Sequence, residues 1–225
     1  MAQSYTFKWV GITPLLLHQD NIEFGDNIEA WRLDASNQKK AGKKKGDDRS
    51  PAWTWLGYLP SDPQTGEAGI PAHYLTSMLA AAGTQIPTGK GMKTYKEAAA
   101  AAVFPEEDYF VLTTKGRTID VHALEAKLIE KEEDFREHLK AVRAAGFDLD
   151  MRRAKVGAGK HVRVRPKFVA WEVTGEVRVD TSCIPVGILE TVFKIMGQRG
   201  LGDFRPSCNR PGRFGMFGAT MKAKK

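Results

Sequence analysis

The fold is decided by residues 161–196, HVRVRPKFVAWEVTGEVRVDTSCIPVGILETVFKIM. The first half of this stretch is rich in β-branched and aromatic residues, which favour strands. Its apolar side chains share one parity up to Phe168 and the other parity from Val169 to Val179. Because a slip of one residue turns every side chain to the opposite face, this change predicts a bulge or two successive strands.

A segment whose apolar residues have helical spacing follows directly after these strands. Residues 185–196 carry apolar side chains on one face and predict an amphipathic helix, with Gly197 as its C-terminal cap. A second helix is expected to open at Gly69–His73, where Pro71 suits the first turn because its missing N–H would have no partner there. The other expected elements are a strand over 5–17, a short helix over 94–102, a strand over 109–112, a long charged helix over 121–145, and a last strand over 214–221.

The order of these elements is strand–helix–strand, an insertion, and strand–helix–strand again. It predicts an α+β fold with a ferredoxin-like or RRM-like antiparallel sheet, helices on one face and large insertions. We expect a single domain over residues 1–225. One insertion, residues 21–60, is expected to be irregular, with a lysine-rich mobile loop over 35–48 that is too polar to bury. The other insertion, residues 115–160, is expected to be helical.

Composition excludes several classes of protein. With 225 residues and 42% hydrophobic residues, the chain fits one globular domain. It has no apolar run of the ~18 residues that span a bilayer and no secretory signal, so we expect a cytoplasmic protein without membrane contact. Cys183 and Cys208 form no CxxC pair and indicate reduced thiols, although a disulfide between them stays open. No Cys or His group has metal-ligand spacing, so we expect no metal and no cofactor.

Charge is distributed unevenly along the chain. The net charge is +7, of which residues 1–60 contribute +1 (8 basic, 7 acidic), residues 61–150 contribute −5 (10 basic, 15 acidic), and residues 151–225 contribute +11 (16 basic, 5 acidic). The C-terminal third therefore concentrates a positive field, which favours a polyanionic partner.

The segment after the last expected helix, residues 197–218, reads GQRGLGDFRPSCNRPGRFGMFG. Glycines allow close backbone approach, arginine forks match phosphate oxygens, and aromatic rings stack on unpaired bases. These three properties together predict a binding loop for single-stranded nucleic acid. The alternative is a glycine-rich turn with buried phenylalanines, an interpretation we favour for Phe217. The candidate binding residues of the loop are Arg199, Arg205, Arg210, Arg213, Phe204 and Phe214.

Two other basic groups are candidates for the same interface. Period two places His161, Arg163, Arg165 and Lys167 on one strand face, about 7 Å apart, which approximates the phosphate spacing of an extended strand. Arg152 and Arg153 lie just before them. The alternative for this group is a solvated outer sheet face. A flexible lysine run could clamp the ligand or only aid solubility; its residues are Lys39, Lys40, Lys43, Lys44 and Lys45.

Two segments together resemble the RAMP superfamily, known from backbone and processing subunits of CRISPR effector complexes. Residues 69–79, GIPAHYLTSML, resemble the family's Ile-Pro helix opening, and the glycine-rich loop resembles its RNA-contacting loop. The resemblance implies a modified RRM fold and protomers that assemble into filaments along nucleic acid. Thr76 and Ser77 depart from the family's Lys-Gly, and the loop core of residues 202–206 is unusual. These departures favour a divergent, phage-encoded relative that binds single-stranded DNA, in a bacterial or phage-infected cell.

The leading hypothesis is therefore a non-enzymatic protein that coats single-stranded nucleic acid, DNA favoured over RNA, as a homo-oligomer and without sequence preference. Three alternatives stay open. The chain could be a CRISPR-type backbone subunit on guide RNA, or a virion structural protein whose basic face meets the packaged genome. It could also be a RAMP-type endoribonuclease that uses His18 or His73, or that cleaves a target at Asp20 or Asp26.

Overall fold

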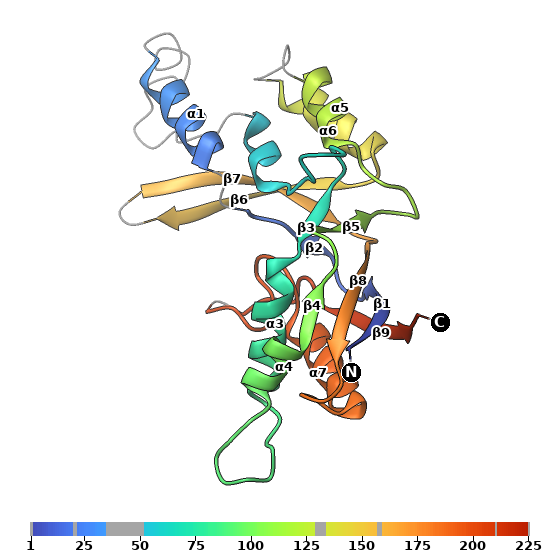
Figure 1. Cartoon of the computed structure of the whole chain (residues 1–225). Coiled ribbons are helices and arrows are strands. Elements are labelled where there is room, and N and C mark those ends of the chain that lie inside the picture. Colours follow the sequence, from blue (N-terminus) through green and yellow to red (C-terminus); the bar gives the residue numbers. More distant parts are fainter. Residues whose placement is uncertain are drawn as a thin grey trace.

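The computed structural model is built from helices and antiparallel sheets, so the expected α+β class is confirmed (Figure 1). It describes residues 2–19, 22–34, 52–128, 134–156, 159–209 and 211–224. The lysine-rich segment 35–48, expected to be a mobile loop, lies outside these ranges. Within them, no helix combines the length and the apolar character needed to cross a membrane.

The main sheet has the strand order β3-β5-β8-β1-β9, with β4 also paired to β8, and every pairing is antiparallel. Its strands are β1 (Ala2–Gly11), β3 (Gly69–Pro71), β4 (Val103–Pro105), β5 (Tyr109–Thr113), β8 (Glu172–Asp180) and β9 (Phe217–Ala223). Along the chain, β1, α3, β5, β8, α7 and β9 follow each other in the predicted order of strands and helices. The first and last strands are therefore neighbours in the sheet.

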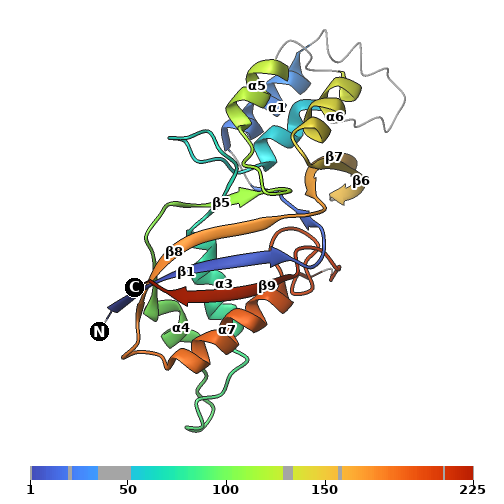
Figure 2. The same cartoon turned by 90° about the vertical axis from the view of Figure 1, so that its right-hand side faces the viewer.

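Three helices cover one face of this sheet, as Figure 2 shows: α3 (His73–Gly83), α4 (Lys96–Ala102) and α7 (Val186–Arg199). Alternation along β1 turns Phe7 and Trp9 towards the helices, where both are buried. Trp9 stacks on Phe217 at 4.9 Å between ring centroids, so Phe217 is a core residue, as its strand position indicated. None of the described helices covers the other face, which we call the open face (Figure 2).

A second sheet, of order β2-β7-β6, carries the remaining elements (Figure 1). They are β2 (Leu15–Leu16), β6 (Asp148–Val156), β7 (Gly159–Phe168), α1 (Ile22–Leu33), the 3-10 helix η1 (Ala52–Tyr58), α5 (Val121–Leu128) and α6 (Phe135–Ala144). Phe147 stacks on Phe168 at 4.9 Å, and the buried Trp55 donates its indole N–H to His138 Nδ1 at 3.0 Å. These side chains belong to one hydrophobic core that continues beneath the main sheet.

Several boundaries differ from the sequence predictions. The single strand expected over 5–17 is wrong, because β1 ends at Gly11 and Leu15–Leu16 joins the other sheet. Pro14 between them has no N–H with which to continue a ladder. Trp171 packs so closely on Gly11 that a Cβ there would lie 2.3 Å from its Nε1. The expected parity change is confirmed as two successive strands, β7 and β8, in different sheets.

Both expected insertions also differ in content. Residues 21–60 are not irregular throughout, since they contain α1 and η1. The single long helix over 121–145 is wrong: Asp134 is not helical and caps α6 by accepting from the N–H groups of Arg136 and Glu137. Residues 115–160 contain the strand β6 as well as helices.

Two predictions about helix ends are wrong. Pro71 ends β3 and does not lie in the first turn of α3. Gly197 lies inside α7, against β9, where a Cβ would be 2.1 Å from the carbonyl oxygen of Phe217. The helix ends instead at Arg199, and Gly200, whose φ of 78° favours glycine, is its C-terminal cap.

Candidate functional site

The glycine-rich loop between α7 and β9 is tied by hydrogen bonds to the connection between β1 and β2. Within the loop, Leu201 donates its N–H to the carbonyl of Gly215 at 2.9 Å. Gly215 donates to the carbonyl of Pro14 at 2.8 Å, and Asp203 donates to that of Leu16 at 2.8 Å. The loop therefore has a defined backbone path, which fixes the direction of its side chains.

Two glycines explain how the loop lies so close to its support. Gly202 has a φ of +78°, and a Cβ there would be 2.2 Å from the carbonyl oxygen of Leu16. Gly215 has a φ of +69°, and a Cβ there would be 1.7 Å from that of Leu201. Both positions need glycine for conformation and for space. The sequence predicted close approach to a ligand, but at these two positions the approach is to the protein's own backbone.

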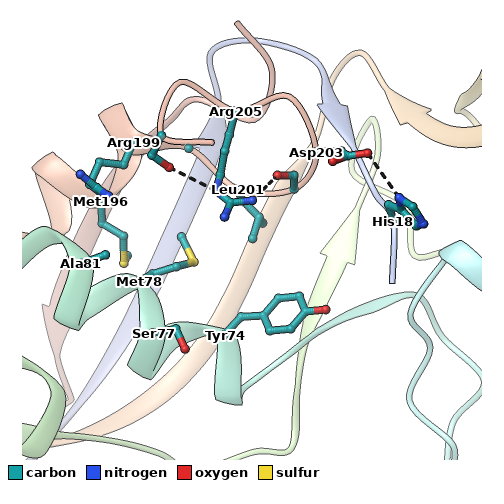
Figure 3. Close-up of a pocket in the computed structure, with 13 residues that line it drawn as sticks. His18, Tyr74, Ser77, Met78, Ala81, Met196, Arg199, Leu201, Asp203 and Arg205 are labelled. Atoms are coloured by element: carbon teal, nitrogen blue, oxygen red, sulfur yellow. Dashed lines mark hydrogen bonds and ion pairs between the residues drawn. The ribbon is translucent and has the colours of Figure 1, made fainter. Parts of the chain in front are cut away.

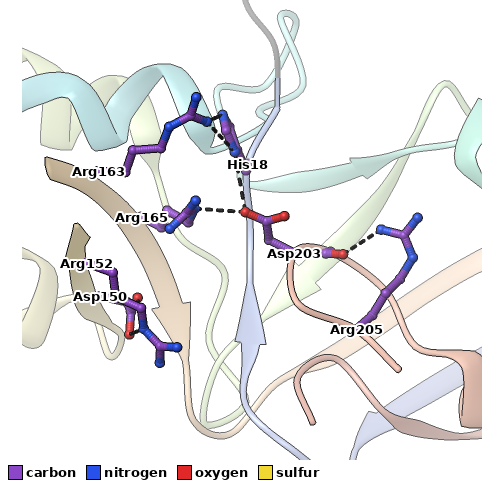
Figure 4. A network of polar contacts seen from close by, with 8 residues as sticks. His18, Asp150, Arg152, Arg163, Arg165, Asp203 and Arg205 are labelled. Atoms are coloured by element: carbon purple, nitrogen blue, oxygen red, sulfur yellow. Dashed lines mark hydrogen bonds and ion pairs between the residues drawn. The ribbon is translucent and has the colours of Figure 1, made fainter. Parts of the chain in front are cut away.

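Asp203 of this loop is the centre of a polar network that reaches the second sheet (Figure 4). Its Oδ2 lies 2.8 Å from Arg165 Nε and 3.4 Å from His18 Nδ1. Arg163 Nη1 lies 3.0 Å from His18 Nε2. In the tautomer with the proton on Nδ1, His18 donates to Asp203 and its Nε2 accepts from Arg163, because arginine can only donate. In that tautomer, Arg163 occupies the lone pair that a general base would use.

Burial determines the electrostatics of this network. The hydrogen bond from His18 lowers the pKa of Asp203, burial opposes that shift, and the charge of Arg165 lowers the pKa further. Burial lowers the pKa of Arg165, whose side chain is 5% exposed, and the charge of Asp203 opposes that change. Its Nε faces Asp203 without the alignment of a hydrogen bond, and its Nη1 has no partner among the described residues. Arg165 is thus enclosed in the protein and does not form part of an open cationic row.

Carboxylates of β6 neutralise part of the positive charge on the strand face that carries Arg163, Arg165 and Lys167. In the ladder of β6 and β7, Asp150 lies opposite Arg165 and Arg152 lies opposite Arg163. Directly opposite residues share a face, so β6 brings carboxylates next to the cations of β7. Arg152 Nε donates to Asp150 Oδ2 at 3.0 Å. Lys167 is half-buried and lies opposite Asp148.

The two candidate phenylalanines of the loop contact the protein's own cations. The Phe204 ring centroid lies 5.6 Å from the guanidinium of Arg152 and 5.2 Å from that of Arg165. The Phe214 ring centroid lies 5.1 Å from that of Arg152. Both rings are half-buried. Cation–π contacts of this length join the loop to the β6–β7 hairpin and leave less of each ring for a ligand.

Arg205 also has partners within the loop. Its Nη1 donates to the carbonyl oxygen of Gly202 at 2.7 Å, and its Nε donates to Ser207 Oγ at 3.1 Å. The sequence predicted a phosphate contact for Arg205. The geometry gives its guanidinium a role in holding the turn that presents Asp203.

A pocket of about 300 Å³ lies between α3, the end of α7 and the glycine-rich loop (Figure 3). Tyr74 and Met78 of α3 and Met196 of α7 give it an apolar wall, while Arg199 and Asp203 are polar members of its lining. Its other lining residues are His18, Ser77, Ala81, Gly200, Leu201, Gly202, Arg205 and Ser207. Tyr74 had not been predicted as a site residue, although the helix that carries it had.

Three arginines near this pocket stand out because the structure gives them no carboxylate partner. Arg163 contacts His18, and none of the three arginines forms an ion pair within the described ranges. Arg213 is exposed, whereas Arg163 and Arg199 are half-buried. The other cations predicted for the site are not placed: Arg210, Lys39, Lys40, Lys43, Lys44 and Lys45 lie outside the described residues, and Arg153 and His161 are described only through the backbone of β6 and β7.

A second hollow, of about 410 Å³, lies on the open face of the main sheet. Two of its lining residues form ion pairs: Lys8 Nζ lies 2.8 Å from Glu172 Oε2, and Glu176 bonds to Lys224, whereas Lys222 has no ion pair among the described residues. Burial raises the pKa of Glu107 beside them, and the charge of Glu176 adds to that rise. This face therefore holds carboxylates as well as cations.

The two cysteines are not disulfide-bonded: Cys183 is exposed and Cys208 is half-buried. Within the described part of the chain, no group of three or more His, Cys, Asp or Glu side chains is arranged to hold a metal ion.

No protein-family model matches this sequence. A search of the curated proteins found no match either. The site therefore has to be interpreted from its own geometry.

Proposed function

We propose that this chain binds single-stranded nucleic acid in the pocket between α3, the end of α7 and the glycine-rich loop, which we call the groove. The observation that carries the proposal is a set of three arginines without an ion pair among the described residues, beside a pocket with an apolar wall. Arg199 lines the pocket, Arg163 contacts its lining residue His18, and Arg213 belongs to the glycine-rich loop. They belong to the third of the chain that carries a net charge of +11. Such a field attracts a polyanion.

Each part of the groove suits one part of a nucleotide. Guanidinium groups form charge-assisted, forked hydrogen bonds to phosphate oxygens. The face of an unpaired base is apolar and stacks on aromatic side chains, so it suits the wall of Tyr74, Met78 and Met196. A base in a duplex is stacked and paired and must be extruded before it can enter a pocket. Single strands are therefore the favoured ligand.

The proposal includes an RRM-like scaffold of the RAMP type that assembles along the strand. The order of β1, α3, β5, β8, α7 and β9, together with their place in one antiparallel sheet, supports the scaffold. Assembly as a homo-oligomer follows from the resemblance to that superfamily. Light scattering with strands of increasing length tests it: particle mass should rise in steps with strand length, and a strictly one-to-one complex on long strands would contradict it.

Binding itself is tested by fluorescence anisotropy with labelled 30-mers of single- and double-stranded DNA and RNA over a range of salt concentrations. We expect tighter binding to single strands, with a slope of log affinity against log salt of about −2 or steeper, from at least three phosphates at about −0.7 each. A preference for RNA over DNA would favour the guide-RNA alternative. Absence of binding, or a slope near zero, would contradict the proposal.

A further inference from the structure

Between α3 and α4 the chain forms a narrow arm, residues 86–95, which projects from the body of the molecule (Figures 1 and 2). Pro87 and Thr94 form an isolated antiparallel bridge. Thr88 donates its N–H to the carbonyl of Lys93 at 2.9 Å, and Tyr95 donates to that of Ile86 at 3.0 Å. The Thr88 hydroxyl adds a hydrogen bond to the same carbonyl at 3.1 Å. The arm is thus two-stranded and internally bonded.

The tip of the arm presents an apolar side chain to solvent. Gly89 and Gly91 have φ values of +75° and +61°, which form the turn. Met92 follows them and is 101% exposed, more than any other large apolar side chain among the described residues. Methionine is unbranched and polarizable, and it adapts to irregular apolar surfaces. A hydrogen-bonded turn that holds such a side chain fully in water requires an explanation other than packing.

Lysines flank this methionine. Lys90 and Lys93 belong to the arm and Lys96 begins α4, and all three are exposed. None of them forms an ion pair within the described ranges, and no acidic residue lies between Gly83 and Lys96. The arm therefore carries two positive charges without a carboxylate partner, Lys90 and Lys93, around one apolar tip.

This combination fits a nucleic acid better than other partners. Nucleic acids alternate phosphates with flat apolar bases, and methionine is among the side chains that proteins insert between base steps. A lipid surface needs a broader apolar face than one side chain provides. The arm also begins where α3 ends, and the earlier turns of α3 line the pocket of the groove. A strand that leaves the pocket along α3 can therefore reach the arm.

We infer that the arm is a second nucleic-acid contact, in which Lys90 and Lys93 bind phosphates and the side chain of Met92 inserts between neighbouring bases. This inference rests on the proposed function and deepens it, because it adds a contact outside the groove and a distortion of the bound strand.

The experiment uses the full chain with single-stranded oligodeoxynucleotides that carry 2-aminopurine at successive positions, because this base brightens when it is unstacked. Binding of the native protein should raise the fluorescence at some positions and leave others unchanged. Met92→Ala should abolish that rise and weaken binding by about three- to tenfold. Lys90→Ala with Lys93→Ala should make the salt slope shallower by about 1.4, two phosphates at about 0.7 each.

Controls come from exposed residues of α7, outside the arm. Val186→Ala removes an exposed apolar side chain and Lys194→Ala removes an exposed lysine, and neither should change fluorescence or affinity. The inference is overturned if the arm variants keep native affinity, slope and fluorescence while the groove variant of Arg163, Arg199 and Arg213 loses binding. If the native protein binds no oligonucleotide, the proposed function fails with it. Binding of the arm to anionic lipid vesicles in a Met92-dependent manner would also overturn it.

Discussion

The open face of the main sheet and the groove beside the glycine-rich loop both carry cations. The two surfaces differ in whether a carboxylate lies next to each cation. On the open face, Lys8, Arg178 and Lys224 each lie next to a glutamate. Around the groove, Arg163 and Arg199 have no carboxylate partner. Net charge alone does not separate the two surfaces. We therefore expect a polyanion to bind the arginines of the groove, which have no ion pair among the described residues, more tightly than the cations of the sheet, three of which already have one.

The largest effect should come from removing the unpaired arginines. Replacement of Arg163, Arg199 and Arg213 by alanine should weaken binding to a single strand at least ~100-fold, because each charge-assisted contact contributes about 1.5–3 kcal/mol and partial exposure reduces that value. Anisotropy titration measures it.

The matched control removes three cations from the open face, Lys8, Arg178 and Lys224. Because each of these cations already lies next to a glutamate, this variant should bind within about threefold of the native protein. It should also keep its fold, since exposed ion pairs contribute about 0–1 kcal/mol to stability. Equal losses in the two variants would mean that the ligand responds to total charge, and the distinction between the two surfaces would fail.

The next effect concerns stability. Asp203→Ala leaves the buried Arg165 guanidinium without its carboxylate, which should lower the free energy of unfolding by about 3 kcal/mol in urea denaturation. Asp203→Ala combined with Arg165→Met should recover much of this loss, since no buried charge remains. Glu172→Gln on the open face should cost less than about 1 kcal/mol. If Asp203→Ala is as mild as Glu172→Gln, the network does not anchor the loop.

The pH dependence of stability separates Asp203 of the polar network from Glu107 of the open face. Asp203 has a lowered pKa in the folded protein, so its stabilising contribution is complete above the unfolded value of about 3.9 and is lost as the pH falls through that value towards the folded pKa. Asp203→Asn should remove this part of the acid destabilisation. Glu107 has a raised pKa, so its contribution has the opposite sign: it is present at low pH and is lost as the pH rises through the folded pKa. Glu107→Gln should therefore remove the loss of stability that Glu107 causes as the pH rises. Denaturation midpoints from pH 3 to 7 distinguish the two.

The smallest effect concerns the aromatic rings. Phe204→Leu removes contacts with Arg152 and Arg165 and should cost about 1–2 kcal/mol, from about 0.5–1 for each cation–π contact. Phe104→Leu on the open face removes one longer contact, with Arg178 at 6.0 Å, and should cost less. A large loss of affinity in Phe204→Leu with an unchanged melting temperature would instead show that the ring stacks on a base.

Local patterns predicted most of the main sheet and its helices. The parity change after Phe168 and the helical spacing of 185–196 are local properties, and both are confirmed. The second sheet was missed because its pairing joins Leu15–Leu16 to residues more than 150 positions away. The break in the helix over 121–145 had a visible signal, since Asp134 with Glu137 three residues later has the spacing of an N-terminal cap.

The candidate site was likewise predicted only where the signal is local. Arginine and glycine content located the loop, but it could not separate Arg165, which is buried against Asp203, from Arg213, which is exposed. That difference depends on the register that places Asp150 opposite Arg165, and on the fold that brings His18 to the loop. Asp203, the one acidic residue of 197–218, was the available signal for a buried partner.

Alkylation of the two native thiols, with and without a saturating single-stranded oligonucleotide, reports where the strand binds. Cys208 lies in the glycine-rich loop, next to Ser207 of the pocket lining, and Cys183 lies in the turn between β8 and α7. Mass spectrometry follows the reaction of each thiol with iodoacetamide. We expect the bound strand to slow alkylation of Cys208 several-fold and to leave Cys183 unchanged. An oligonucleotide that binds and leaves Cys208 as reactive as before would contradict a binding site in the groove.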